Sequence, residues 1–148
     1  MGSPCPESWH SIDLNVTGQQ SETFFKYDGS TVAAQNLAGA SSCGGGGAQQ
    51  VFDFVAPSAG DWRFEISGTE AGADTVLFVR SECAAVAPEY ELACNDDMDP
   101  ASDSRLSAVE LHLLQDQAIT IIVDSYVNAL LGSGVYRGPF TLNAVRVF

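Results

Sequence analysis

The chain has 148 residues, 45% of them hydrophobic, and this length fits one domain with a sizeable core. Six basic residues stand against nineteen acidic ones, and the net charge of −13 argues against binding to nucleic acid or to anionic membranes. There is no apolar run of about 18 residues, which argues against a transmembrane helix.

The first residues carry little structural signal. Residues 1–3, Met-Gly-Ser, have the composition of a leftover from cloning, and residues 1–10 are expected to form a flexible N-terminal segment. No charged stretch followed by an apolar core marks a signal peptide, so we expect that any native export signal has been removed. Residues 1–148 are expected to form a single domain.

Strand patterns follow one another along the chain. Residues 61–67, DWRFEIS, alternate strictly between apolar and charged side chains, which is typical of a half-buried strand. Residues 57–60, PSAG, form a turn before it. The predicted strands are 12–16, 22–28, 50–56, 61–67, 74–80, 90–94, 106–114, 118–126 and 138–148.

Two segments allow more than one interpretation. Residues 106–114 place Leu106, Val109 and Leu113 at helical spacing, but we favour a strand because the neighbours are strands, joined onward by a polar hairpin loop at 115–117. The glycine-rich segment 38–50 lacks the lysine and Ser/Thr of a phosphate loop and indicates a flexible or tight turn. About nine short strands predict an all-β, two-sheet antiparallel sandwich of jelly-roll type.

Four cysteines predict two disulfides in an oxidising compartment, and their spacing argues against structural zinc. Three pairings are open. We favour Cys83–Cys94, because these residues bracket a short turn, which leaves Cys5 to pair with Cys43. Free buried thiols are the alternative.

An acidic loop follows Cys94, in the segment CNDDMDPASDSR. Hard cations such as calcium are held by several oxygen ligands, although Pro100 and Leu106 stand where an EF-hand needs glycine and glutamate. Two interpretations stay open: a calcium site built from several loops, or a solvated acidic turn partly neutralised by Arg105. The candidate ligands are Asp74, Asn95, Asp96, Asp97, Asp99 and Asp103.

Catalytic patterns are weak. The histidines are His10 and His112, no nucleophile elbow is present, and the pair Asp53 and Glu65 is expected on outward strand faces, so we expect no enzyme. Asp124 ends a strand and is expected to accept backbone N–H bonds from a neighbouring loop, with a metal ligand as the alternative. The candidate partner-binding residues are the tyrosines Tyr126 and Tyr136.

The ordered set CGGGGAQQVFDFVAPSAGDWRFEISG, ADTVLFVRSEC, YELACNDD, SRLSAVELHLLQDQAITIIVDSY and GPFTLNAV resembles the bacterial pre-peptidase C-terminal domain family over about residues 40–146. Those domains are β-sandwiches on secreted proteases and large extracellular proteins, and the calcium-dependent collagen-binding domains of bacterial collagenases look like relatives. The resemblance implies a non-catalytic exported module, supports the disulfides, and favours a metal near Asp74 and residues 95–97. The acidic stretch that precedes the first strand in the collagenase domains is missing here.

Two functions are therefore expected for an extracellular or periplasmic protein. The first is a binding or attachment module for an extracellular matrix, polysaccharide or protein. The alternative is a self-assembling subunit of an extracellular fibre or coat, with the first forty residues or loop 129–140 exchanged between neighbours by strand addition.

Overall fold

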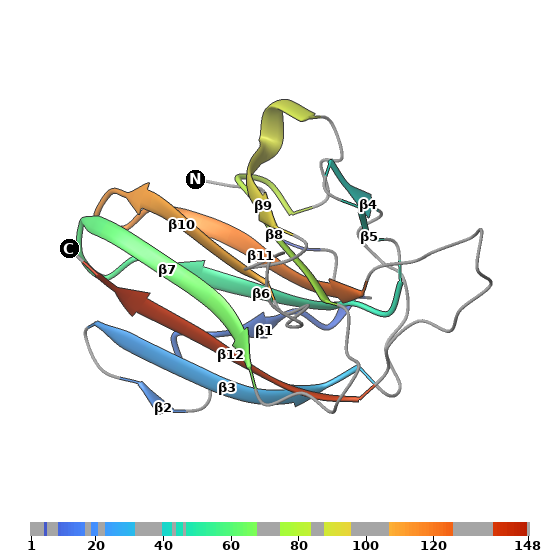
Figure 1. Ribbon diagram of the computed structural model, residues 1–148. Helices are drawn as coiled ribbons and strands as arrows, with labels where there is room; N and C mark the ends of the chain where they lie inside the picture. The colour runs from blue at the N-terminus through green and yellow to red at the C-terminus, as the bar shows by residue number, and fades with distance from the viewer. Residues whose placement is uncertain are drawn as a thin grey trace, which may run out of the picture.

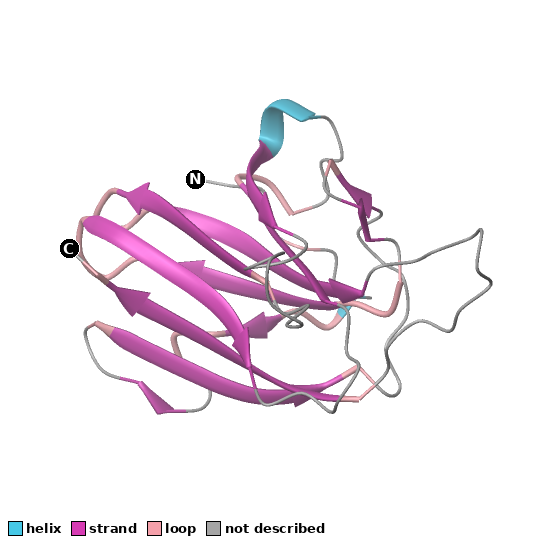
Figure 2. Cartoon of the chain, in the orientation of Figure 1, coloured by secondary structure: helices cyan, strands magenta, loops and turns pink. Residues whose placement is uncertain are grey.

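The computed structural model describes residues 5, 9–16, 19–20, 23–31, 40–42, 44–45, 47–67, 75–83, 88–95, 107–125 and 138–147. Two five-stranded sheets lie face to face, which confirms the predicted all-β sandwich (Figure 1). Each of the predicted strands has a counterpart, and the described helical content is confined to short 3-10 turns (Figure 2). No helix in the described part of the chain is long and apolar enough to cross a membrane.

The two main sheets have the same number of strands. Sheet A runs in the order β1 (Ile12–Asp13), β6 (Gln50–Val55), β11 (Ala118–Ser125), β8 (Thr75–Arg80) and β9 (Glu91–Asn95). Sheet B runs in the order β10 (Ala108–Leu113), β7 (Gly60–Ser67), β12 (Pro139–Arg146), β3 (Phe24–Ser30) and β2 (Gln19–Gln20). A small ribbon contains β4 (Ala40–Ser41) and β5 (Gly44–Gly45), and a 3-10 turn, η2, spans Pro88–Tyr90. Only β1 and β6 pair in parallel among these described strands.

The core lies between the sheets and is rich in aromatic side chains. Strand β7 shows the predicted alternation, because Trp62, Phe64 and Ile66 are buried and the residues between them are half-exposed. The rings of Phe54 and Trp62 pack edge to face at a centroid distance of 5.2 Å, across the two sheets. Such contacts add about 1 kcal/mol each beyond the area they bury.

Residues 106–114 contain a strand, as predicted: β10 pairs with β7 over its whole length. The expected hairpin at 115–117 is wrong in one respect, because β10 belongs to sheet B whereas β11 belongs to sheet A. The exposed turn connects the two sheets at one end of the core, with Asp116 at a φ of 64°. Alternation of apolar residues is the same whether the next strand pairs with its predecessor or crosses to the other sheet, so the sequence pattern could not distinguish them.

The outermost strands β1 and β2 come from the N-terminal part of the chain. Strand β1 lies on the free edge of β6, and β2 lies on the free edge of β3. At the end of β6 the side chain of Asn15 takes the place of a strand: its Oδ1 accepts a hydrogen bond from Val55 N and its Nδ2 donates to Val55 O, both at 2.8 Å. Covered edges of this kind protect a sheet from pairing with other chains.

Candidate functional site

Strand ends of both sheets meet at one end of the sandwich, which we call the loop end. In sheet A the pairs Ser125–Thr75 and Leu77–Asn95 place the end of β11, the start of β8 and the end of β9 together. In sheet B the end of β7 pairs with the start of β12. The long connections 68–74, 96–106 and 126–137 all join strand ends located here. The opposite end, where the C-terminal strand finishes in Figure 1, has the short turns 56–59 and 114–117 and the connection 81–90 between β8 and β9; we call it the turn end.

Buried polar groups fix the strand ends at the loop end. The hydroxyl of Ser107 donates to the carbonyl of Thr75 at 2.7 Å and lies 2.9 Å from the Thr75 hydroxyl. Ile66 N donates to Ser107 O at 3.0 Å, which joins the two sheets at this point. Fully satisfied polar networks of this kind hold a backbone in one arrangement.

Of the six predicted metal ligands, Asn95 lies within the described residues. Asn95 is the last residue of β9, and its Oδ1 accepts a hydrogen bond from Ala108 N at 3.2 Å. The other five candidates, Asp74, Asp96, Asp97, Asp99 and Asp103, lie outside the described residues. The described residues next to them, Thr75 and Asn95, lie at the loop end. Within the described ranges, no group of three His, Cys, Asp or Glu side chains could hold a metal ion.

Asp124 on β11 has the structural role predicted for it. Its carboxylate, 1% exposed, accepts a hydrogen bond from Gly47 N at 2.9 Å and one from Gln49 Nε2 at 2.7 Å. The carboxylate therefore fastens the end of the glycine-rich segment to sheet A. A buried charge is tolerated where hydrogen bonds and an opposite charge compensate its lost hydration.

Arg80 on β8 supplies a positive charge on the outer face of sheet A, the face on which Asp124 also lies. Burial lowers the pKa of Arg80, and the charges of Glu91 and Asp124 act in the opposite direction, so that the guanidinium stays protonated. Its Nη1 donates to Cys83 O at 3.3 Å, and its Cζ lies 5.1 Å from the centroid of the Phe78 ring. Sequence alternation places Arg80 on an outward face, but it gives no sign that this face is covered.

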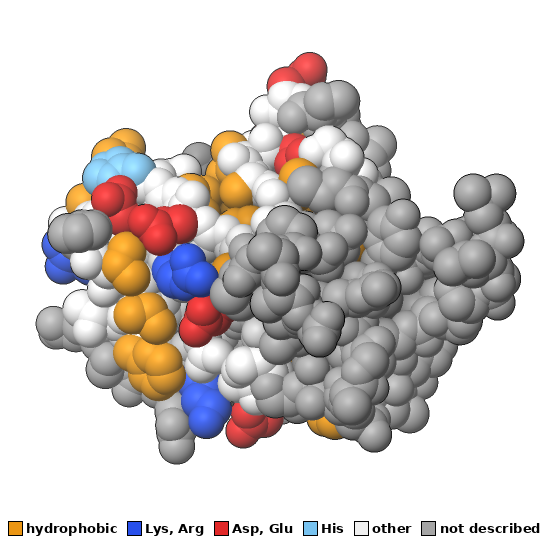
Figure 3. All heavy atoms as spheres, in the orientation of Figure 1, with side chains coloured by type: hydrophobic (Ala, Val, Ile, Leu, Met, Phe, Trp, Pro, Cys, Tyr) orange, Lys and Arg blue, Asp and Glu red, His pale blue; other side chains and the backbone are white. Residues whose placement is uncertain are grey.

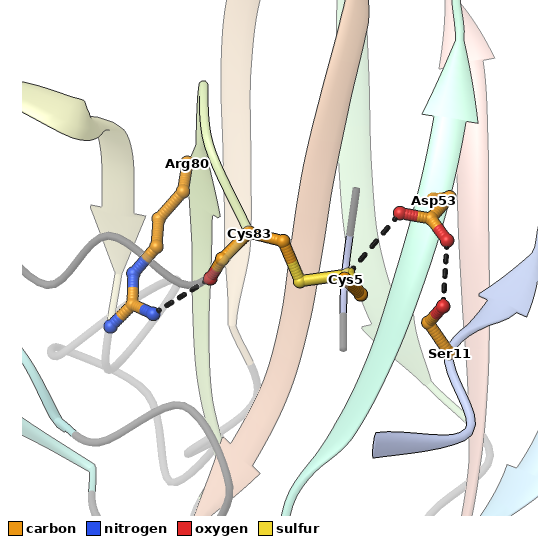
Figure 4. The surroundings of a disulfide bond; sticks show 5 residues. All are labelled: Cys5, Ser11, Asp53, Arg80 and Cys83. Carbon is orange, nitrogen blue, oxygen red and sulfur yellow. Dashed lines mark hydrogen bonds between the residues drawn. A yellow bond between two sulfur atoms is a disulfide. The ribbon is translucent and has the colours of Figure 1, made fainter. Parts of the chain in front are cut away.

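The preferred disulfide pairing is wrong, because Cys83 is bonded to Cys5 (Figure 4). Strands β8 and β9 form a hairpin in which Cys94 faces Phe78, so Cys83 lies beyond the paired region and is directed toward the N-terminal segment. Closing a loop over a sequence separation of 78 residues restricts the unfolded chain and stabilises the fold by about 4.5 kcal/mol. Cys94 is also disulfide-bonded, and Cys43 lies outside the described residues.

The outer face of sheet B differs from that of sheet A. In Figure 3 hydrophobic, acidic and basic side chains lie exposed over β7, β10 and β12. Arg63 lies 3.1 Å from Glu65 and 3.8 Å from Glu110, and His112 Nδ1 lies 3.0 Å from Asp61 Oδ1. Because these exposed charges pair with one another, they form an ordinary solvated surface.

Among the described residues, the remaining sequence candidates do not lie together. Asp53 lies on the outer face of sheet A and Glu65 on the outer face of sheet B, so the two carboxylates cannot act on one substrate. Both sulfur atoms of the Cys5–Cys83 pair are bonded to each other. Tyr126 and Tyr136 fall in the connection 126–137, outside the described residues.

No protein-family model matches the sequence, and no curated protein matches it. Solved structures do match. The pre-peptidase C-terminal domain of a collagenase from Bacillus anthracis covers 90% of this chain and 91% of its own, with 14% identity and a TM-score of 0.50. PliG from Aeromonas hydrophila, a periplasmic inhibitor of g-type lysozyme, covers 91% of this chain and 94% of its own, with 13% identity and a TM-score of 0.51. The resemblance read from the sequence is thus confirmed at the level of the fold.

Proposed function

We propose that the chain is a non-catalytic, exported binding module that attaches through its loop end to an extracellular protein or polysaccharide. The observation that carries this proposal is the asymmetry of the sandwich. Three long connections, 68–74, 96–106 and 126–137, leave from the loop end, whereas the turn end has the short turns 56–59 and 114–117 and one longer connection, 81–90. A rigid scaffold that presents several loops at one end is a common architecture for recognition.

Export is supported by the disulfides, because such bonds form and persist in oxidising compartments. Two of the structures with a similar fold are a domain of a collagenase and an inhibitor of a lysozyme. A likeness of fold at such low identity leaves the partner open, so collagen, g-type lysozyme and polysaccharides all belong among the ligands to test.

We further propose that calcium stabilises the loop end. The connection 68–74 contains Glu70 and Asp74, and the connection 96–106 contains four aspartates against one arginine. Calcium takes six to eight oxygen ligands, and the two acidic connections start or finish at neighbouring strands of sheet A. The alternative is that this acidity serves solubility.

Binding to immobilised fibrillar collagen, g-type lysozyme and a polysaccharide array tests the proposal. We expect one of these ligands to retain the protein, and we expect Tyr126→Ala with Tyr136→Ala to weaken that binding at least tenfold. Tyr90→Ala is the matched control, since Tyr90 lies in η2, outside the connections that leave from the loop end. Equal losses in the control, or no retention on any ligand, would contradict the proposal.

A further inference from the structure

We propose that the N-terminal segment, defined as Cys5 and residues 9–16, is an exchangeable edge strand. The surface that it covers on sheet A is then an interface for the same segment of a second copy, used when the Cys5–Cys83 bond is open. This inference concerns self-association and does not depend on the proposed binding function.

The first part of this surface is the edge of β6. Strand β1 pairs there over two residues, Ile12 with Phe52 and Asp13 with Asp53. Leu14 N donates to Asp53 O at 2.9 Å, and the Asn15 side chain pairs with both backbone groups of Val55. Strand addition of this kind uses main-chain groups, which an identical segment from another chain can supply equally well.

The second part is the outer face of sheet A. Trp9 and Cys5 pack against a buried cluster made up of Val51, Val76, Phe78, Cys83 and Ile122. Figure 4 shows Cys5 and Ser11 each next to a different carboxylate oxygen of Asp53, with the Ser11 hydroxyl donating to Asp53 Oδ2 at 2.7 Å. Cys5 Sγ lies 3.3 Å from Asp53 Oδ1, and this is a contact, because an oxidised sulfur carries no proton to donate.

Leu14 anchors the segment in the main core, where its side chain is fully buried. These contacts come from one short stretch at the beginning of the chain, and the covered surface comes from strands far along it. Exchange of such an element between identical copies preserves every contact. Whether the segment binds its own chain or a second copy is therefore decided by the effective concentration of each. The Cys5–Cys83 disulfide, which spans a sequence separation of 78 residues, keeps the segment bound to its own chain.

Opening the bond needs a reductant of the thiol class. A dithiol gives two electrons and two protons, so that Cys5 and Cys83 become thiols and the reductant becomes its own disulfide. Cys5 is partly exposed, whereas Cys83 is buried, so Cys5 carries the more accessible sulfur. On reoxidation by a small disulfide such as oxidised glutathione, which takes up the two electrons and two protons and becomes two thiols, Cys5 of one copy can bond to Cys83 of another at high protein concentration.

An isotope-mixing experiment tests the exchange directly. Equal amounts of unlabelled and 15N-labelled protein are reduced with dithiothreitol, mixed at high concentration and reoxidised. We expect a species of twice the 15.6 kDa monomer mass, in which about half of the Cys5–Cys83 linked peptides join a labelled to an unlabelled fragment. A dimer that contains only single-label Cys5–Cys83 peptides, or no dimer at all, would overturn the proposal.

Substitutions give an independent readout without redox chemistry. Cys5→Ser with Cys83→Ser removes the covalent link to the segment, and we expect a dimer fraction that rises with protein concentration. Cys43→Ser with Cys94→Ser is the matched control: it removes two cysteines, keeps the link at Cys5, and is expected to stay monomeric. The same oligomeric state in both variants would contradict the proposal. If the first variant fails to fold, the isotope experiment on the unaltered chain decides.

Discussion

At the scale of single residues, the alternation of side chains along a strand predicts which face of the sheet a side chain lies on. It does not predict which other segments cover that face. Arg80 and Asp124 alternate with core residues and are therefore expected outside, yet both are buried, because segments distant in sequence lie over sheet A. The hydrogen-bonding role of Asp124 was predictable from its place at the end of a strand. The burial of Arg80 was not, because long-range cover leaves no local pattern.

The hydrogen bonds of Asp124 lead to a first prediction. Asp124→Asn places an amide donor where Gly47 N and Gln49 Nε2 both donate, and it removes the negative charge near Arg80. We expect the free energy of unfolding to fall by about 2 to 3 kcal/mol, measured by urea denaturation. Asp28→Asn is the control: Asp28 is exposed, and its change should stay within about 0.5 kcal/mol. Equal effects would show that Asp124 is not a structural anchor.

The cysteines give a second prediction. The hydroxyl of Ser42 lies 3.1 Å from the sulfur of Cys94, which is itself disulfide-bonded. With Cys5 and Cys83 joined, we expect Cys43 to be the partner of Cys94. Peptide mapping without reduction should recover Cys5–Cys83 and Cys43–Cys94, whereas a Cys83–Cys94 peptide would contradict the described hairpin register.

At the scale of elements, strand identity was largely predictable and strand pairing was not. Strict alternation in 61–67 and the polar break at 115–117 marked their elements correctly. The short strands β2, β4 and β5 were missed, because pairs of Gln, Gly or small residues have no apolar periodicity. Sheet order depends on contacts across the core, so the cross-over at 114–117 became visible only in the fold.

A glycine in β3 leads to a third prediction. A Cβ added at Gly29 would lie 2.7 Å from Phe140 Cζ and 2.7 Å from Gln50 Oε1, which is closer than real contacts. Gly29→Ala is expected to lower the free energy of unfolding by about 1 to 3 kcal/mol through overpacking between the sheets. Ser30→Ala, on the exposed face of the same strand, serves as the control and should change little. Thermal and chemical unfolding both report the difference.

At the scale of the whole molecule, the two ends of the sandwich differ in a way that the sequence suggested only indirectly. The spacing of predicted strands showed where the long connections occur, but not that they leave from the same end. That follows from the antiparallel register of both sheets together with the hydrogen bonds around Ser107. The predicted ligand Asn95 lies at this end, and its oxygen is engaged with Ala108.

Calcium gives a fourth prediction at this scale. If the acidic connections hold the ion, millimolar calcium should raise the melting temperature by several degrees, since a ligand that binds the folded state stabilises it by mass action. Excess chelator should reverse the shift, and Asp96→Asn with Asp97→Asn should abolish it. Asp61→Asn, on the outer face of sheet B, should leave the shift intact. A melting temperature indifferent to calcium would leave these aspartates as solvated surface.

The most direct test of a loop-end binding module is hydrogen–deuterium exchange of the protein with and without the ligand that retains it. We expect slower exchange in the connections 68–74, 96–106 and 126–137, and unchanged exchange in the turns 56–59 and 114–117. Protection confined to the turn end, or to the outer face of sheet B, would contradict recognition through the loop end.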